Sequence, residues 1–399
     1  MTAPDPCRRQ SPLQRDSFCR AEACRPPPSS HPCRTSSQTA GARGASPTAY
    51  AILGPVTDAF PFARAVHFEN FRVLRKTTLP LDRFTLLIGP NGSGKSTAML
   101  GLQVVDDDSF SFEQLASVAT RSDDHESSVQ VSVEWSDAPW LMTSVWTSSG
   151  GHRFGHTNSA GQSIDRVDIR EWSAHMKLVS GFRIFALDGQ AIAAPVRLEP
   201  HMQIGPRGEN LAGVLDRLRD EAPEVFRALN DEIRRCLPDF DQILFETPGS
   251  GMRAFLLRTR QGGHKIPAEN LSQGTLFLIT ILAIAYGQEA PPIVCFEDPD
   301  RGIHPRLLSE IRDALYRLSH PETVGQQRQP VQVIVTTHSP YLLDVYRDHP
   351  EAIVIAEKTD DGAKFERLAD REELADLLRD THLGDAWYSG VLGGVPADS

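Results

Sequence analysis

The nine residues from Gly89 to Thr97, GPNGSGKST, restrict the fold of this 399-residue chain more than any other stretch. They match Gly-x-x-x-x-Gly-Lys-Ser, the sequence of a loop whose backbone N–H groups close around phosphate oxygens. The preceding run Phe84 to Ile88 is mostly apolar, as in a buried strand, and the helical pattern of Leu100 and Leu102 follows the loop. A strand, a glycine-rich turn and a helix therefore predict a P-loop rather than a glycine turn that only caps a helix.

Each part of this loop has an expected role in nucleotide binding. The backbone N–H groups and the helix N-terminus favour the negative charge of phosphates. Lys95 is expected to reach the β- and γ-phosphates, and the Ser96 hydroxyl is expected to ligate Mg²⁺. We therefore expect ATP and Mg²⁺ as cofactors. The residues predicted to hold ATP are Gly89, Pro90, Asn91, Gly92, Ser93, Gly94, Lys95, Ser96 and Thr97.

Charge and hydropathy limit the location and the partners. Residues 1–60 carry seven Arg and four Asp or Glu, so the remaining residues carry a net charge of −14. An acidic body argues against broad, nonspecific nucleic-acid binding. The longest apolar run, Leu276 to Tyr286, has eleven residues, fewer than the roughly 20 that a membrane helix needs. We expect a cytoplasmic protein that does not attach to a membrane.

Residues 1–62 are predicted to form a disordered tail because they are rich in Pro, Ser, Ala and Arg and lack hydrophobic periodicity. This segment also lacks the apolar core of a signal peptide. Its four cysteines lack the C-x-x-C pair of zinc sites, which disfavours metal binding. They are Cys7, Cys19, Cys24 and Cys33. Cys236 and Cys295 lie in apolar patterns and are expected to be reduced core residues.

Strand patterns surround the P-loop. Ala65 to Phe68 and a second run leading to Leu81 predict an antiparallel lead-in to the loop strand. Apolar and polar residues alternate from Val129 to Trp135, as in a strand with one buried face, and Leu141 to Thr147 continues this β layer. His152 to His156 has HxxxH spacing, but the segment reads as extended. A solvated hairpin is therefore favoured over a metal site.

The middle of the chain is predicted to form an inserted lobe of helices and strands, residues 105–251. Helical spacing recurs from Leu211 to Leu218 and from Val225 to Ile233. Several arginines on these helices suggest either a nucleic-acid surface or a solvated face mixed with acidic residues, and the second is favoured. They are Arg217, Arg219, Arg227, Arg234 and Arg235. Residues 63–104 and 252–399 are predicted to form the nucleotide-binding core.

A segment beginning with Leu271 to Thr275, LSQGT, adds a helix start after the inserted lobe. Ser272 is suited to be the N-cap of a helix because its side-chain oxygen can accept a hydrogen bond from a free backbone N–H. Leu276 to Tyr286 continues as an apolar, buried helix. By itself this pattern predicts only a helix, so its meaning depends on the segments that follow.

Two apolar strands then end in residues suited to phosphate chemistry. Ile293 to Phe296 is followed by Glu297 and Asp298, the form of a Walker B element. Such a carboxylate pair can hold Mg²⁺ and orient an attacking water. Val331 to Val335 leads to His338, which is positioned to meet the γ-phosphate. In this order after a P-loop, these segments indicate one composite nucleotide site.

These segments resemble the ABC-type ATPase heads of SMC, RecF and OLD-like proteins, which are often classed as AAA family ATPases. The resemblance spans residues 65 to about 345 and rests on VHFENFRVLRKTTL, GPNGSGKST, LSQGT, VCFEDPDRGIHP and VTTHSPYLL. The C-terminal LGDAWYSGVLGG resembles the tail of small bacterial ATPases of this class. The resemblance implies an α/β P-loop NTPase fold with a mixed central sheet, an antiparallel β lead-in and an inserted helical and β lobe.

The same resemblance implies a homodimer in which LSQGT of one subunit closes on the P-loop of the other around ATP. By this resemblance Ser272 and Gly274 contact the γ-phosphate in trans. Glu297 joins Ser96 in coordinating Mg²⁺, Asp298 polarises water, and His338 is the switch histidine. The implied catalytic residues are Lys95, Glu297, Asp298 and His338.

Three departures from the family pattern refine this prediction. ABC proteins usually carry Asp then Glu, whereas this chain has Glu297 then Asp298. Asp is one methylene shorter than Glu, and a positioning error near 1 Å costs on the order of 100-fold in rate, so we predict slow hydrolysis. His304 stands where transporters carry the Asp of the D-loop, and Gln190 is the candidate for the Q-loop glutamine. We expect the C-terminal segment to be too short for the Toprim nuclease domain that OLD proteins carry there.

The leading functional hypothesis is an ATPase whose dimerisation switches a surface for DNA or for a separate nuclease or Toprim-type effector. DNA repair, DNA maintenance and defence against phage are the corresponding settings. The order of Glu297 and Asp298 motivates an alternative, an ATP sensor that does not hydrolyse ATP and scaffolds a partner. A third alternative, the motor subunit of an ABC transporter, is disfavoured by the RGIHP segment and the RecF-like lead-in from Glu69 to Arg72.

Overall fold

The computed structural model describes residues 60–117, 127–164, 166–287, 290–326, 328–359, 362–372 and 382–393. The predicted disordered tail up to residue 59, with its four cysteines, lies outside the described residues. The sequence pattern also predicts a helix from Arg371 to Leu378, and most of that segment lies outside the described residues. Phe62, at the end of the predicted tail, is buried, and its carbonyl accepts a backbone hydrogen bond of 2.9 Å from Ser136.

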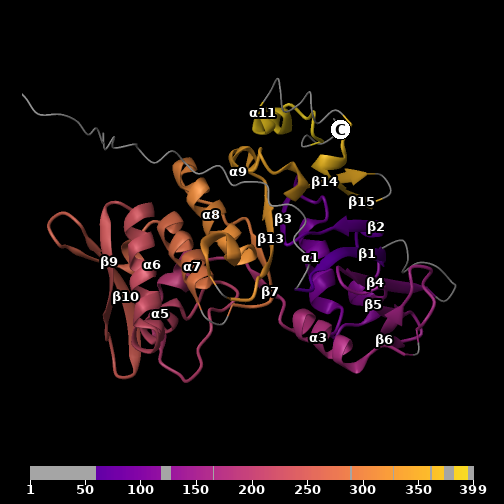
Figure 1. Cartoon of the computed structure of the whole chain (residues 1–399), viewed down its shortest axis with the longest axis horizontal. Coiled ribbons are helices and arrows are strands. Elements are labelled where there is room, and N and C mark those ends of the chain that lie inside the picture. Colours follow the sequence, from indigo (N-terminus) through magenta and orange to yellow (C-terminus); the bar gives the residue numbers. More distant parts are fainter. Residues whose placement is uncertain are drawn as a thin grey trace, which may run out of the picture. The chain divides into compact units, whose positions relative to one another are not determined.

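Five antiparallel strands form a lead-in sheet in the order β2-β1-β4-β5-β6 (Figure 1). Their bounds are β1 Ala63–Phe71, β2 Leu74–Pro80, β4 Ser128–Trp135, β5 Leu141–Thr147 and β6 His152–Thr157. The alternating pattern of β4 buries Val129, Val131, Val133 and Trp135 on one face. The predicted antiparallel lead-in is confirmed, and β4 to β6 extend it beyond the two strands expected there.

Six strands form the central sheet in the order β15-β14-β3-β13-β12-β7. Their bounds are β3 Phe84–Ile88, β7 Arg183–Phe185, β12 Ile293–Glu297, β13 Gln332–Thr337, β14 Ile353–Thr359 and β15 Gly362–Arg367. Neighbouring strands from β14 to β7 are parallel, and only β15 runs antiparallel to its neighbour. The predicted mixed central sheet is confirmed.

The apolar runs of the central strands are buried on both faces, as expected where a parallel sheet is covered on both sides. Leu86 of β3 and Phe296 of β12 pack in the cluster that contains helices α7 Gln273–Tyr286 and α8 Leu308–Ser319. The alternate residue Leu87 packs in a second cluster with helix α1 Lys95–Val104 and the lead-in sheet. The central sheet therefore carries the P-loop strand between two layers of apolar side chains.

Helices and a third group of strands join the α7 side of the core. The strands are β8 Val196–Arg197, β9 Phe240–Glu246, β10 Met252–Thr259 and β11 Lys265–Pro267. The other α-helices in the described residues are α2 Phe112–Leu115, α3 Ile169–Ser180, α4 Gly189–Ala193, α5 Leu211–Glu221, α6 Pro223–Cys236, α9 Pro340–Val345 and α11 Leu383–Tyr388. Short 3₁₀ turns cover Ala268–Asn270, Pro305–Leu307, Pro321–Val324, Pro350–Ala352 and Leu368–Asp370.

The predicted division of the chain at residues 105 and 251 remains a prediction, and strand pairing crosses both boundaries. β4 pairs with β1, and β9 pairs with β10. β7, from the middle of the predicted lobe, is the edge strand of the central sheet. A strand's partner is set by long-range packing, which the local pattern of the predicted lobe does not contain.

The arginines of α5 and α6 follow the expected mixed-charge pattern, whereas His152 and His156, predicted in a solvated hairpin, are half-buried in β6. Arg219 forms ion pairs with Asp216 and Asp220, and Arg235 pairs with Glu232. The ring of His152 stacks on Trp146, and the ring of His156 lies edge-on to Trp140. Within the described ranges, no group of three or more His, Cys, Asp or Glu could hold a metal ion. No described helix is long and apolar enough to span a membrane.

Candidate nucleotide-binding site

Three parallel strands bring the predicted site residues to one edge of the central sheet. Ile88 of β3 pairs with Thr337 of β13, and Thr336 pairs with Glu297 of β12. The carboxyl ends of parallel strands meet at the same edge, which is where ligands bind in sheets of this kind. The P-loop, the Glu297–Asp298 pair and the segment carrying His338 therefore leave the sheet side by side.

The P-loop backbone needs glycine at two kinds of position. Gly92 and Gly94 have φ angles of 78° and 90°, in the left-handed region that glycine adopts without steric cost. Gly89 needs its missing side chain for space, since a Cβ there would lie 2.5 Å from the carbonyl oxygen of Ala356 in β14. The loop is thus held against β14 while its own backbone turns toward helix α1.

Lys95 begins α1 and is buried beneath the loop, with 6% of its surface exposed. Its Nζ donates hydrogen bonds to the carbonyl oxygens of Gly89 at 2.7 Å and Pro90 at 3.1 Å. Burial lowers the pKa of Lys95 to about 8, against the opposing effect of the Asp298 and Glu297 carboxylates. The ammonium group therefore lies against the loop, where both Walker B carboxylates favour its charged form.

His338 lies between Lys95 and Asp298. Its Nδ1 is 3.4 Å from Lys95 Nζ, and its Nε2 is 4.0 Å from Asp298 Oδ1. Burial and the positive charge of Lys95 lower the pKa of His338, while the Asp298 carboxylate opposes the shift. The structure thus joins the predicted catalytic lysine, carboxylate and histidine in one row.

Asp298 has an unusual backbone for a residue other than glycine. Its φ angle is 42°, in the left-handed region that Asn and Asp tolerate better than most residues. Its N–H donates to the carbonyl oxygen of Thr336 at 3.1 Å, which ties the residue to the end of β13. The turn out of β12 therefore sets the direction of the Asp298 side chain, and strained backbone of this kind occurs often at active sites.

Two buried polar atoms and the available oxygen ligands fit nucleotide and Mg²⁺. Ser93 Oγ and Asp298 Oδ1 are buried, and neither has a hydrogen-bond partner in the described part of the chain. Ser96 is exposed at the start of α1, and Glu297 is half-buried at the end of β12. Mg²⁺ in phosphate sites takes one or two protein oxygen ligands and completes its shell with phosphates and water. The residues present therefore fit the expected cofactors.

The LSQGT segment lies at the start of α7. Ser272 Oγ accepts a hydrogen bond of 3.1 Å from the Thr275 backbone N–H, which confirms the predicted N-cap. A Cβ on Gly274 would lie 2.6 Å from the carbonyl oxygen of Gly302, so this helix start packs against the loop after β12. The described residues show no hydrogen bond or ion pair that joins Ser272 or Gly274 to the P-loop of the same chain.

Two further predicted residues lie near the same edge. Gln190 is exposed in α4, the helix that follows β7. β7 pairs in parallel with β12. His304 Nδ1 accepts a hydrogen bond of 3.2 Å from the Arg306 backbone N–H and so begins a short 3₁₀ turn. Their assignments to the Q-loop and D-loop positions remain predictions.

The structure adds a residue that the sequence pattern did not single out. Asp300 accepts a 3.0 Å hydrogen bond from Thr337 Oγ1, although 37 residues separate them. Burial raises the pKa of the Asp300 carboxyl group, while the hydrogen bond from Thr337 opposes the shift. The signal in the sequence was the pair of hydroxyl residues, Thr337 and Ser339, on either side of His338, but their partner follows only from strand pairing.

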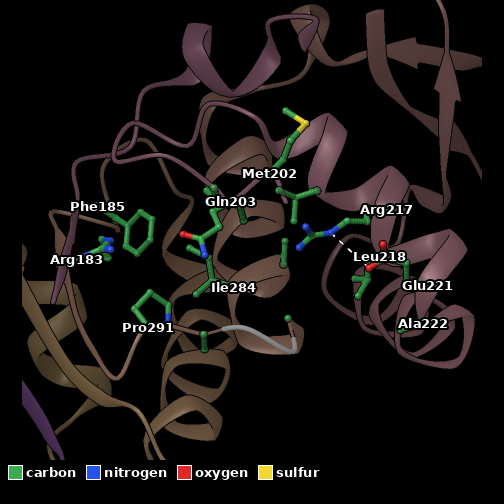
Figure 2. Close-up of a pocket in the computed structure, with 15 residues that line it drawn as sticks. Arg183, Phe185, Met202, Gln203, Arg217, Leu218, Glu221, Ala222, Ile284 and Pro291 are labelled. Atoms are coloured by element: carbon green, nitrogen blue, oxygen red, sulfur yellow. Dashed lines mark ion pairs between the residues drawn. The ribbon is translucent and has the colours of Figure 1, made fainter. Parts of the chain in front are cut away.

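A cavity of about 110 Å³ lies elsewhere, between α5 and the C-terminal half of α7 (Figure 2). Its wall is mostly apolar and includes Phe185, Leu218 and Ile284. Arg217 and Glu221, which form an ion pair of 3.6 Å, lie on its α5 side. None of the predicted site residues lines it. The candidate nucleotide site therefore lies at the loops of the sheet edge and is separate from this cavity.

Two family models match the sequence on either side of residue 138. One, described as AAA domain, putative AbiEii toxin, Type IV TA system, matches residues 169–344. The other, described as AAA ATPase domain, matches residues 64–138. Together they include the lead-in strands β2 and β4 and nearly all of β1, the P-loop, LSQGT, the Walker B strand and His338. No curated protein matches the chain.

Solved SMC heads share the fold at low sequence identity. An SMC head bound to the C-terminal winged-helix domain of ScpA aligns with a TM-score of 0.54 and 15% identity over 76% of this chain and 97% of that one. The head from Pyrococcus furiosus, bound to the C-terminal domain of ScpA, aligns with a TM-score of 0.53 and 14% identity over 80% of this chain and 100% of that one. A head from Pyrococcus yayanosii aligns with a TM-score of 0.50 and 12% identity over 80% of this chain and 99% of that one. The chain therefore shares the fold of SMC heads and carries two segments that are similar to AAA ATPase domains.

Proposed function

We propose that this protein binds ATP with Mg²⁺ and hydrolyses it slowly. The observation that carries the proposal is the meeting of Lys95, Asp298 and His338 at the edge where the P-loop leaves the sheet. The P-loop amides and Lys95 hold the phosphates, and Ser96 and Glu297 are the residues that would hold Mg²⁺. The metal, when bound, neutralises charge on the phosphate oxygens. Asp298 polarises the attacking water, and His338 contacts the γ-phosphate.

The rate is expected to be low because of Asp298. Its side chain is one methylene shorter than the Glu found at this position in most ABC proteins, so the carboxylate ends farther from a bound water. Near-attack geometry is sensitive to errors of about 1 Å, which can cost on the order of 100-fold. Slow turnover suits a switch because the ATP-bound state then persists long enough to engage a partner.

A second copy of the chain is the proposed source of the missing half of the site. Ser272 is exposed at the start of α7, Gly274 is buried beside it, and neither forms a hydrogen bond with its own P-loop among the described residues. The N-terminus of α7 carries partial positive charge and free N–H groups that favour a phosphate. Two heads related by a two-fold axis place this helix start against the partner's nucleotide.

The test is ATP turnover and mass in solution. Lys95→Ala should abolish ATP binding or turnover, and Asp298→Asn should bind ATP and accumulate as a dimer. Lys265→Ala, an exposed lysine on β11, is the matched control and should behave as wild type. Phosphate release measures turnover, and light scattering with and without ATP measures mass. Wild-type protein that stays monomeric with ATP would rule out the dimeric site.

The output of the switch is proposed to be DNA or a partner effector, in DNA maintenance or in defence against phage. The family model that covers residues 169–344 is described by a putative AbiEii toxin, and the similar SMC heads were solved with ScpA bound. The acidic body favours a local over an extended DNA contact. ATP turnover measured with and without double-stranded DNA tests this, and an unchanged rate together with no DNA binding would leave the protein effector as the output.

A second candidate is an ATP sensor that scaffolds a partner without hydrolysis. The Glu297–Asp298 order favours it, because it places the shorter carboxylate in the water-polarising position. Phosphate release separates the two functions. If wild-type turnover does not exceed that of Asp298→Asn while ATP still binds, the sensor is correct.

A further inference from the structure

Asp300 lies two residues beyond Asp298, in the loop that follows β12. Its Oδ1 accepts a 3.0 Å hydrogen bond from Thr337 Oγ1, at the end of β13. The Thr337 oxygen in turn accepts a 3.0 Å hydrogen bond from the Ser339 backbone N–H. One carboxylate thus fixes the chain on both sides of His338.

The chemistry of the Thr337 hydroxyl makes this arrangement specific. A hydroxyl has one proton to donate and two lone pairs that accept. Because the proton goes to a carboxylate, the bond is charge-assisted, and the lone pair left over binds the next N–H along the chain. Thr337 is fully buried, so water does not compete for either bond. Removing the carboxylate would leave the buried hydroxyl unsatisfied and free to rotate away from Ser339.

The two segments joined in this way are those that carry the catalytic pair. Asp298 precedes Asp300 by two residues, and His338 lies between Thr337 and Ser339. The separation of 4.0 Å between Asp298 Oδ1 and His338 Nε2 therefore depends on a contact next to it in both segments. The Asp298 N–H also bonds to the Thr336 carbonyl oxygen at 3.1 Å, so the Asp300–Thr337 bond adds a side-chain contact to this backbone contact between the two segments.

We propose that Asp300 is a positioning residue that, through Thr337 and Ser339, sets His338 against Asp298 for ATP hydrolysis. The inference rests on the proposed function, since it names a further residue of the same site. Asp300 acts through another residue and does not touch the nucleotide. Its loss is therefore expected to lower kcat and to leave nucleotide affinity nearly unchanged.

The first experiment compares kcat and KM for ATP in four variants. Asp300→Ala and Thr337→Val each remove the hydrogen bond and should lower kcat about 10- to 100-fold, with KM within about threefold of wild type. Asp300→Asn and Thr337→Ser keep an acceptor and a donor and should restore most of the rate. The double variant Asp300→Ala with Thr337→Val should be no slower than the slower single variant, because both changes remove the same bond.

The matched control is Asp344→Ala. Asp344 also accepts a backbone hydrogen bond, from Gly384 at 2.8 Å, but this bond holds α11 to α9, and in the described part of the chain the Asp344 carboxylate has no hydrogen bond or ion pair with a residue of the site. Its loss should lower the thermal midpoint without a comparable fall in kcat. Equal losses of kcat in Asp344→Ala and Asp300→Ala, or additive losses in the double variant, would overturn the positioning role.

A second readout does not depend on turnover. The imidazole resonances of His338, assigned by their absence in His338→Gln, should shift in Asp300→Ala and Thr337→Val but not in Asp344→Ala. If these resonances stay in place, Asp300 does not position His338. If the wild type releases no phosphate, the proposed ATPase fails, while the resonances still decide whether the imidazole depends on Asp300.

Discussion

The Nε2 atom of His338 lies 4.0 Å from Oδ1 of Asp298, although forty residues separate them in the chain. The parallel pairing of β12 with β13 creates this proximity, because both residues follow the carboxyl ends of their strands. Both side chains are about two-fifths exposed, so a nucleotide and a water can reach them. The pair lies beside Lys95, and the following predictions start from this geometry.

Asp298→Asn is expected to remove the side-chain charge and to leave the backbone conformation unchanged. Asn accepts the left-handed φ of 42° about as well as Asp, so the thermal midpoint should stay close to that of wild type. Turnover should fall about 100-fold or more, since an amide polarises water poorly. Asp298→Val should lose turnover and also about 1–2 kcal/mol of stability, because a β-branched residue is strained at this φ. Equal thermal midpoints for the two variants would contradict the strain.

Gly89→Ala and Gly92→Ala should differ although both lie in the P-loop. A Cβ at Gly89 would lie 2.5 Å from the backbone oxygen of Ala356, which cannot move without displacing β14. Overpacking of this kind costs about 1–3 kcal/mol. A Cβ at Gly92 meets nothing within 4 Å, so only the φ of 78° opposes it. Chemical denaturation should give Gly89→Ala a lower free energy of unfolding than Gly92→Ala. The reverse order would contradict the close packing against β14.

His320 should make stability depend on pH between about 4 and 6.5. Burial lowers the pKa of His320 to about 4, and the positive charges of Arg83 and His349 contribute to this shift. The Glu322 and Asp82 carboxylates oppose it. The unfolded state then binds more protons in this window, so the free energy of unfolding falls as pH drops from 6.5 to 4, by up to about 3 kcal/mol. The free energies of unfolding of wild type and His320→Gln, measured by urea denaturation, should converge at low pH. Parallel pH profiles for the two proteins would exclude this group.

Cys236 and Cys295 should resist alkylation in the native protein. Burial, with the nearby Glu310 carboxylate, raises the pKa of Cys236 to about 12, and burial raises that of Cys295 well above its ordinary value. The thiolate is the reactive form, so iodoacetamide at pH 8 should label both peptides slowly in buffer and fully in urea. Mass spectrometry of the two peptides measures this. Rapid labelling of Cys236 in buffer would show that α6 opens readily.

Much of the local structure could be predicted from the sequence because each pattern is contained in one segment. The apolar run FTLLI predicted β3 with its observed bounds, and Leu141 to Thr147 likewise predicted β5. Ser272 was recognised as an N-cap from its type and from the apolar helix after it. The P-loop was recognised because glycine, lysine and serine at these spacings satisfy the geometry of a phosphate directly.

The partners of the strands could not be predicted in the same way. The alternation in β4 shows that one face is buried, but not that β4 pairs with β1 in the lead-in sheet. β7 has only three residues, so its place beside β12 at the edge of the central sheet depends on packing and not on pattern. Strand pairing therefore joins segments on either side of the predicted domain boundaries.

The sequence by itself determined that Gly89 to Thr97 have the spacing of a phosphate-binding loop and that carboxylates and a histidine follow later apolar strands. Only the tertiary structure decided that Asp298 and His338 lie 4.0 Å apart, and that Asp300 bonds to Thr337 between them. The physical reason is that backbone and cap preferences act over a few residues. Strand order, in contrast, is decided by burial of apolar faces that lie far apart in the chain. The local sequence of an apolar strand does not specify which other apolar strand becomes its partner.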